Sequence, residues 1–308
     1  MRRKLVKQGQ NALTVTIPAI WTKSNHLKAG DEIEIEQIES DLLITTEYKH
    51  KKEETKLKLE TNDFYFIKGS IKTLYRLGYD LIEINFKTKI QEKHIKETVD
   101  TLLGFEIVDE KKDQIVIENI TEPMEEKQEV LLRRIFLITK ETFEIIINDI
   151  KLNANKKNRF NNLNLVKELT LRADKYDGFC RRSISKRRFE EKKIVFYWEM
   201  YQRLLLIQYS LNNIYQTLET EKPNKISIKL IETIEFIKQQ YLVLYKIYFQ
   251  NEPNLIQTVN LEIIKERHHK IHPLIMKSTG FENVIFTYCS ELCRSINLLS
   301  LPLIAIMQ

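Results

Sequence analysis

Cysteine, glycine and proline are scarce in this 308-residue sequence, which contains three, seven and six of them. The cysteines form no CxxC pair, so zinc-ribbon and redox-dithiol motifs are excluded and a reducing compartment is favoured. Little glycine and proline beside much Leu, Ile, Lys and Glu favours long helices joined by few turns. The opening residues, MRRKLVKQGQ, contain no apolar segment of the signal-peptide type.

Long hydrophobic segments and catalytic motifs are also missing. The charge-free tracts at 204–218 and 295–308 are shorter than the roughly 18–20 residues that a membrane helix needs. We therefore expect a cytoplasmic protein with no membrane insertion. There is no P-loop, no GxGxxG and no GxSxG elbow, and the six histidines are scattered. We expect no enzyme.

The composition, 43% hydrophobic and 30% charged, is that of an ordinary folded chain long enough for two or three domains. The net charge of +6 is unevenly placed. Residues 1–28 contain six Lys or Arg and no acid, whereas residues 29–50 contain seven acids and one Lys. Such an oriented field is typical of an anion-binding face. A basic leader that is merely solvated is the alternative.

The first 48 residues predict a small β-rich unit. Leu13, Val15 and Ile17 alternate with polar residues and predict a strand, and Pro18 is placed to start a short helical turn. Alternation returns at 32–38, and a short connection at 39–41 predicts a hairpin with 42–45. A core this small cannot support itself, so we expect an obligate homodimer.

After a polar linker at 49–55, the pattern predicts a β-α-β-α-β-β module. The expected elements are a strand at 56–60, a helix at 63–77, a strand at 81–86, a second helix ending at Gly104, and a hairpin of 105–109 and 114–118. No phosphate loop and no cluster of His or Asp suggests catalysis in this module. We interpret it as structural or dimerising.

From Pro123 onward the apolar spacing is helical throughout. Five further helices are expected after the first one, at 164–189, 194–219, 225–250, 255–276 and 281–306. Short connections between them favour one or two antiparallel bundles. The predicted fold class is therefore α+β and multidomain, with domains at 1–48, 56–120 and 123–308.

Three motifs follow one another in the first 46 residues: KQGQN at 7–11, VTIP at 15–18 and KAGDEIEI at 28–35. Together they resemble a SpoVT/AbrB-type swapped-hairpin domain. The resemblance implies an intertwined dimer that binds double-stranded DNA through basic residues of the first strand and the following loop.

Two further stretches extend the resemblance, LYRLGYDLIEINF at 74–86 and TLLGFEIVDEKKDQIVI at 101–117. They resemble the middle region of archaeal PhoU-type regulators, in which an AbrB domain precedes a PhoU-like helical bundle. The resemblance covers nearly the whole chain and weakens toward the C-terminus. It implies a role in regulating phosphate uptake and phosphate homeostasis.

Bacterial PhoU helices carry pairs of acids four residues apart, and such pairs can hold metal ions on one helix face. In this sequence the pattern is eroded. Asp177 is preceded by Ala173 at that spacing, with Asp174 one residue out of phase. Other expected acids fall on Gln202 and Leu206, and Thr287 precedes Glu291. We therefore predict no metal and no cofactor.

The candidate DNA-binding residues lie in the basic N-terminal segment. Arg2, Arg3 and Lys4 are the main candidates, because cations release condensed counterions from DNA phosphates. Lys7 and Lys23 come next. Asn11 is a weaker candidate, whose amide could contact base edges or brace the loop.

These features predict a homodimeric DNA-binding transcriptional regulator whose bundle receives a signal. The alternative is an adaptor that binds phosphate-transport proteins through its bundle and uses residues 1–122 only to dimerise. An antitoxin-like role is a third interpretation, but an antitoxin usually needs only a short toxin-binding tail.

Four other groups of residues have a structural and a functional interpretation. A zinc or iron site is conceivable on the helix at 255–276, but a solvated face is favoured for its polar residues Glu262, Glu266, His268, His269 and His272. Cys289 and Cys293 are expected to be buried packing residues. The aromatic segment 196–201 is expected in the bundle core or a subunit interface. The basic stretch 181–193 is expected to be a solvated connection.

Overall fold

The computed structural model describes residues 2–9, 12–38, 41–46, 52–121, 127–153, 160–186 and 193–307. The chain is mixed α+β and 66% helical, with small sheets followed by a helical C-terminal region, which confirms the predicted class. Its internal contacts divide it into two compact units, Met1–Lys52 and Glu53–Gln308. The finer division into three domains stays a prediction.

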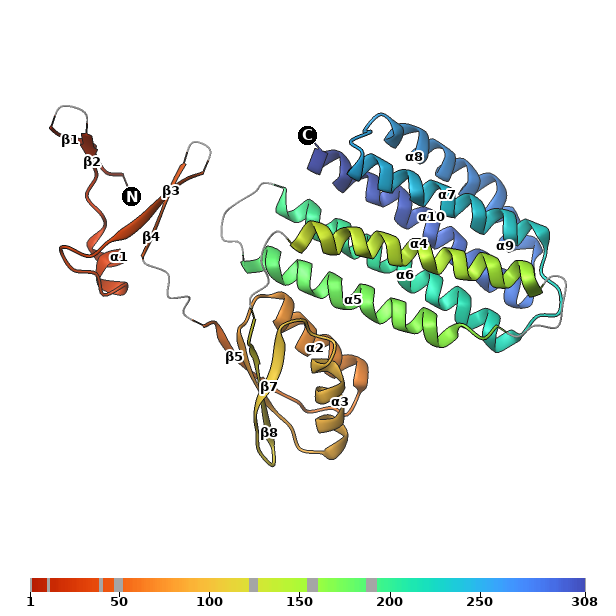
Figure 1. The fold of residues 1–308 in the computed structure, drawn as a ribbon, viewed down its shortest axis with the longest axis horizontal. Coiled ribbons are helices and arrows are strands. Elements are labelled where there is room, and N and C mark those ends of the chain that lie inside the picture. Colours follow the sequence, from red (N-terminus) through yellow and green to blue (C-terminus); the bar gives the residue numbers. More distant parts are fainter. Residues whose placement is uncertain are drawn as a thin grey trace. The chain divides into compact units, whose positions relative to one another are not determined.

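The first unit consists of two hairpins and a short helix (Figure 1). Strands β1 (Val6–Gln8) and β2 (Ala12–Thr14) pair antiparallel, and Gly9 follows β1 with a φ of 79°, which glycine adopts without strain. Helix α1 (Ala19–Ser24) begins after Pro18. Strands β3 (Ile33–Ile38) and β4 (Asp41–Thr46) form the second hairpin. The sequence predicted the helix and the second hairpin. Of the strand predicted through Leu13, Val15 and Ile17, β2 includes only Leu13 and ends at Thr14, and β1 was not predicted.

No described side chain of this first unit is buried. Large apolar residues lie open instead: Ile20 is 77% exposed, Leu42 66% and Leu13 64%. A two-stranded hairpin is marginally stable on its own in water. The unit taken alone therefore lacks the apolar burial that would hold it together.

The second unit begins with an α/β module. Its strands and helices are β5 (Glu54–Lys58), α2 (Phe64–Arg76), β6 (Leu81–Asn85), α3 (Lys89–Val99), β7 (Phe105–Glu110) and β8 (Gln114–Asn119). The sheet order is β5-β6-β8-β7, with β5 and β6 parallel and the other pairs antiparallel. Both helices lie on the same side of the sheet (Figure 1). The elements follow the predicted β-α-β-α-β-β order.

Local signals explain this module. The carboxylate of Asp63 accepts a hydrogen bond from the Phe66 amide at 2.7 Å and so caps α2. Thr88 and Gln91 form a capping box at the start of α3. The helices bury an apolar face on the sheet, and the shared core contains Ile67, Ile71, Tyr75, Ile82, Ile84, Ile95, Ile115 and Ile117.

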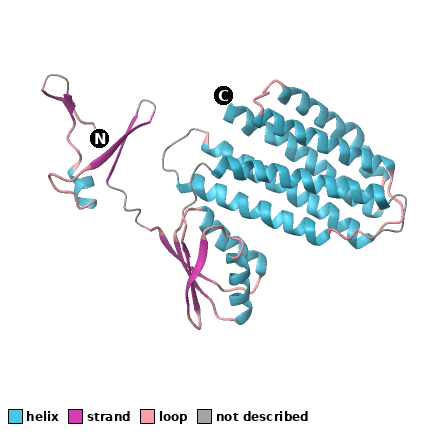
Figure 2. Ribbon diagram, viewed as in Figure 1, coloured by secondary structure: helices cyan, strands magenta, loops and turns pink. Residues whose placement is uncertain are grey.

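The rest of the second unit is a bundle of long helices lying alongside one another (Figure 2). Its helices are α4 (Lys127–Asn153), α5 (Leu163–Lys186), α6 (Ile194–Glu221), α7 (Ile228–Phe249), α8 (Leu255–Lys265), α9 (His272–Lys277) and α10 (Gly280–Met307). Between α8 and α9 the chain forms a π-helix, Glu266–Ile271. The single helix predicted at 255–276 is thus interrupted. Pro273 has no amide hydrogen to donate, which disturbs the α-helical bonding just before it.

Helix α10 lies in the core of the bundle. Its buried residues include Phe286, Leu292 and Leu299. By length and composition alone, α10 is apolar enough to cross a membrane, and 56% of its most apolar window is buried inside the protein. Buried core helices of globular proteins meet the same criteria, so this is weak evidence. Cytoplasmic localisation stays a prediction.

Candidate nucleic-acid interface

The predicted DNA-contacting cations lie before β1, on β1 and on α1. Arg2, Arg3 and Lys4 precede β1, Lys7 is in the middle of β1 opposite Leu13, and Lys23 is in the last turn of α1. All five are exposed. Asn11, the sixth candidate, lies outside the described residues.

None of these five side chains forms an ion pair or hydrogen bond with another described residue. The acids of the unit are on other elements: Asp31 and Glu32 precede β3, and Glu34 lies within it. The Asp31 carboxylate accepts a hydrogen bond from the Lys28 backbone amide at 2.6 Å. It is not paired with any of the five cations. Unpaired, exposed Lys and Arg are available to phosphate oxygens.

A second charged cluster lies in the other unit, where α2 packs against α5. Lys68, Lys72 and Arg76 are four residues apart on α2 and point toward Asp174 and Asp177 of α5. The Lys72 ammonium donates a hydrogen bond to Asp174. The Arg76 guanidinium donates to Asp177 at 2.7 Å. We call this cluster, together with Arg181 of α5, the α2–α5 seam.

Arg181 completes the seam from the next turn of α5. Its Nε and one terminal nitrogen donate to the same Asp177 oxygen at 2.9 and 2.7 Å. Burial raises the pKa of Asp177, and the neighbouring Arg181 and Arg76 only partly oppose this. Burial would also raise the pKa of Asp174, but Lys72, Lys68 and Arg76 outweigh it and lower that pKa.

The seam bears on metal binding, because Asp174 and Asp177 lie where the resemblance to PhoU-type proteins implies metal-binding acids. Both carboxylates are already paired with Lys or Arg from α2 and α5. Within the described ranges, no three His, Cys, Asp or Glu side chains are placed to hold a metal ion together. The seam was not predicted from the sequence, although Lys68, Lys72 and Arg76 follow one another at a spacing of four on a predicted helix.

A further set of ion pairs joins the module to the bundle around Asp80. One Asp80 oxygen accepts hydrogen bonds from Arg182 at 2.6 Å and from Lys186 at 2.5 Å. Arg182 also donates to the backbone carbonyls of Tyr75 and Tyr79 at 3.0 and 2.6 Å. Through these contacts the C-terminal end of α5 joins the helical bundle to the α/β module.

The Asp80 contacts correct one prediction. The stretch 181–193 was expected to be a solvated connection, but Arg181 and Arg182 are buried. They lie in α5, which was expected to run to residue 189 and ends at Lys186. Both guanidinium groups find carboxylate partners, which is what permits their burial. Residues 187–192 lie outside the described residues.

The histidines near the π-helix mostly confirm the expected solvated face. Glu262, His268 and His269 are exposed, and the rings of His268 and His272 meet edge to face at 4.9 Å. Two residues differ from this expectation. Glu266 is buried and pairs with Lys270 at 2.7 Å, and His272 is half-buried, with its Nε2 3.3 Å from the Ser290 hydroxyl. The π-helix begins at Glu266.

The three cysteines are free and buried, which confirms the packing interpretation of Cys289 and Cys293. Burial raises the pKa of Cys180 and of Cys293 to about 12 and that of Cys289 well above its usual value. The reactive thiolate form is therefore nearly absent at neutral pH.

We expect none of the three thiols to react with a disulfide reagent in the folded protein at pH 8. All three should react once the chain is unfolded in guanidinium, because burial alone protects them. The reaction is followed by the absorbance of released thionitrobenzoate. Rapid release of one or more equivalents from folded protein would contradict the burial described above.

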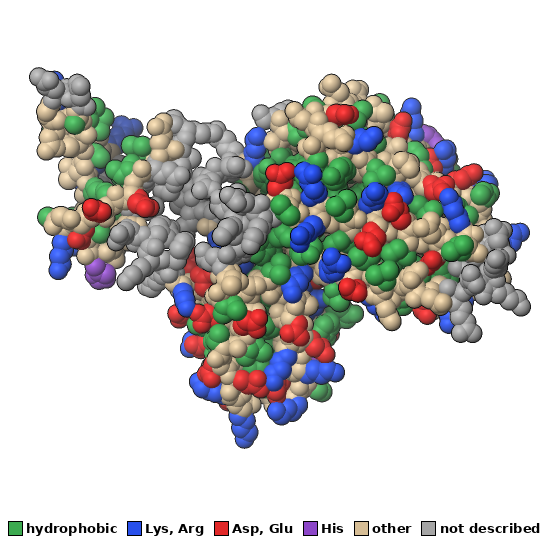
Figure 3. Space-filling view, in the orientation of Figure 1, with side chains coloured by type: hydrophobic (Ala, Val, Ile, Leu, Met, Phe, Trp, Pro, Cys, Tyr) green, Lys and Arg blue, Asp and Glu red, His purple; other side chains and the backbone are tan. Residues whose placement is uncertain are grey.

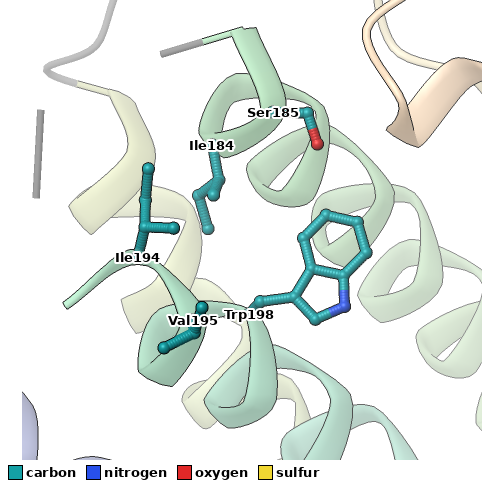
Figure 4. Close-up of a pocket in the computed structure, with 5 residues that line it drawn as sticks. All are labelled: Ile184, Ser185, Ile194, Val195 and Trp198. Atoms are coloured by element: carbon teal, nitrogen blue, oxygen red, sulfur yellow. The ribbon is translucent and has the colours of Figure 1, made fainter. Parts of the chain in front are cut away.

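The aromatic segment at the start of α6 packs against the bundle core, which is one of the two positions predicted for it. Met200 and Tyr201 are buried, and Phe196, Tyr197 and Trp198 are partly buried against the core. A small apolar hollow of about 380 Å³ lies beside Trp198 between the ends of α5 and α6 (Figure 4). It is lined by Ile184, Ser185, Ile194, Val195 and Trp198.

Acidic and basic side chains are interspersed on the visible surface of the helical bundle (Figure 3). The basic segment of the first unit is therefore the candidate nucleic-acid interface. Comparisons with protein-family models, with curated proteins and with solved structures find no match to this chain.

Proposed function

We propose that this protein is a DNA-binding transcriptional regulator whose N-terminal unit contacts the DNA backbone. The observation that carries the proposal is the set of five exposed cations on residues 2–23, none of them paired with a described acid. No Asp or Glu occurs in the first 28 residues to compete with phosphate for these charges. Lys and Arg placed in this way bind the phosphate backbone and position a protein on the duplex.

The active form of the regulator is a homodimer built on the SpoVT/AbrB-like unit. Support comes from the open apolar face of the second hairpin, where Ile35 lies opposite Ile44 and Gln37 opposite Leu42. Ile35 is 59% exposed and Leu42 66% exposed in the single chain. A second copy covers these residues and doubles the number of cations, as paired half-sites on DNA require.

The helical region acts as a PhoU-like domain, and the regulated process is phosphate uptake. This part of the proposal rests on the resemblance of 74–86 and 101–117 and on the helical bundle that follows them. The bundle has two conformational states that differ in how the N-terminal unit binds DNA. A signal bound by the bundle changes DNA binding only if it favours one of these states over the other.

The test is binding of the full chain to duplex DNA, including its own upstream region, by fluorescence anisotropy at about 150 mM salt. The Arg2→Ala/Arg3→Ala/Lys4→Ala variant is expected to bind at least about 100-fold more weakly, because a dimer loses six phosphate contacts.

The matched control removes three exposed lysines of the module, as Lys58→Ala/Lys89→Ala/Lys93→Ala. Their side chains are 68%, 93% and 72% exposed. This variant lowers the net charge by the same amount as the N-terminal variant and leaves the first unit unchanged. The control should bind DNA like the unchanged protein. Equal binding by the N-terminal variant, or no binding by the unchanged protein, contradicts the proposal and favours the adaptor.

A further inference from the structure

The α2–α5 seam has more cations than acids. Lys68, Lys72, Arg76 and Arg181 pair with only two carboxylates, Asp174 and Asp177. Among the residues that the structure describes, these four cations have no other acidic partner within ion-pair distance. The seam therefore has a formal excess of two positive charges.

This excess lies in a mostly buried place. Lys72, Arg181, Asp174 and Asp177 are all buried. An uncompensated charge away from water is costly, because neither solvent nor a counter-charge stabilises it. Burial accordingly lowers the pKa of Lys72, even though Asp174 beside it acts in the opposite direction.

The two side chains at the open edge of the seam, Lys68 and Arg76, have unused hydrogen-bonding capacity. Lys68 and Arg76 are its two partly exposed cations, with 23% and 21% of their side chains accessible. Lys68 Nζ is 3.7 Å from Asp174, and the Arg76 terminal nitrogen is 3.5 Å from the same carboxylate, so neither makes a short bond to it. Arg76 Nε is buried and has no hydrogen-bond partner in the described structure.

We propose that this open edge binds a small, doubly charged oxyanion between Lys68 and Arg76. Lys68 Nζ and the Arg76 terminal nitrogen lie 3.7 and 3.5 Å from the two oxygens of Asp174, so both charged groups are at the same carboxylate. Guanidinium and ammonium groups together are the usual protein partners of such anions. A charge of −2 cancels the excess of the seam, whereas a metal cation would be repelled by four positive side chains.

The test is thermal unfolding of the full chain in increasing inorganic phosphate or sulfate, compared with chloride at equal ionic strength. We expect a saturable rise in Tm, of roughly 5 °C at a hundredfold excess over Kd, because the anion binds only the folded state. Phosphate and sulfate should both act, since the site recognises charge and shape. No rise beyond that in chloride overturns the proposal.

The site is located with Lys68→Met, which removes one edge cation and leaves the buried pairs intact. Isothermal titration calorimetry with phosphate should give a Kd at least about tenfold higher than for the unchanged protein. The control is Lys93→Met on α3, whose ammonium is also 3.7 Å from its acid, Glu97, but lies outside the seam. An unchanged Kd in Lys68→Met, or equal weakening in both variants, overturns the assignment. No DNA is present, so this outcome is independent of the proposed DNA binding.

Discussion

Replacing Asp177 by Ala is expected to lower the free energy of unfolding of Glu53–Gln308 by about 3–5 kcal/mol. The Asp177 side chain is fully buried and accepts hydrogen bonds from both Arg76 and Arg181. Without it, two guanidinium groups remain in a low-dielectric seam that already has too few acids. Removing one partner of a buried pair costs far more than the pair contributes, because the remaining charge stays buried.

Urea unfolding followed by circular dichroism at 222 nm measures this loss. The control is Asp109→Ala, which removes an acid of the exposed pair between Asp109 and Lys111 at 3.0 Å. Exposed pairs contribute about 0–1 kcal/mol, so the control should change little. If Asp177→Ala and Asp109→Ala lower the free energy of unfolding by similar amounts, the seam does not hold the module and the bundle together.

Replacing Ile35 by Asp is expected to convert the homodimer into a monomer at micromolar concentration. In the proposed dimer this side chain is covered by the second copy, and a buried, unpaired carboxylate there costs several kcal/mol. Since each 1.4 kcal/mol is a factor of ten, the dissociation constant rises roughly 10³-fold or more. In the single chain Ile35 is 59% exposed, so the monomer itself tolerates the change.

Light scattering coupled to size-exclusion chromatography gives the mass directly. The unchanged protein should elute at about twice the chain mass of 36.8 kDa, and the Ile35→Asp variant near that mass. Glu34→Ala, on the opposite face of the same strand, should remain dimeric. A monomeric unchanged protein, or a dimeric Ile35→Asp variant, would refute the dimer.

The sequence predicted the α/β module almost element by element, because its signals are local. The alternation through Ile82 and Ile84 gave β6, and the spacing of the apolar residues together with Gly78 gave α2 and its end. Strand β1 was missed because three exposed residues, Val6–Gln8, show no apolar alternation. The π-helix was not predicted because the apolar residues of the stretch 255–276 are spaced as in an ordinary α-helix.

The candidate site could be predicted only in part. A count of charges along the chain is enough to identify the basic N-terminal segment. The seam needs knowledge of the fold, because Lys72 and Asp174 are 102 residues apart. Arg181 and Arg182 looked solvated for the same reason, since their burial depends on partners that the sequence does not place beside them.

The salt dependence of DNA binding tests the central claim most directly. For the unchanged dimer, a plot of log Kobs against log salt is expected to have a slope of about −5, from six neutralised phosphates at Arg2, Arg3 and Lys4. Between 50 and 200 mM salt the affinity should fall about 10³-fold. The Arg2→Ala/Arg3→Ala/Lys4→Ala variant should lose most of this slope. A variant with the same slope as the unchanged protein would contradict the account.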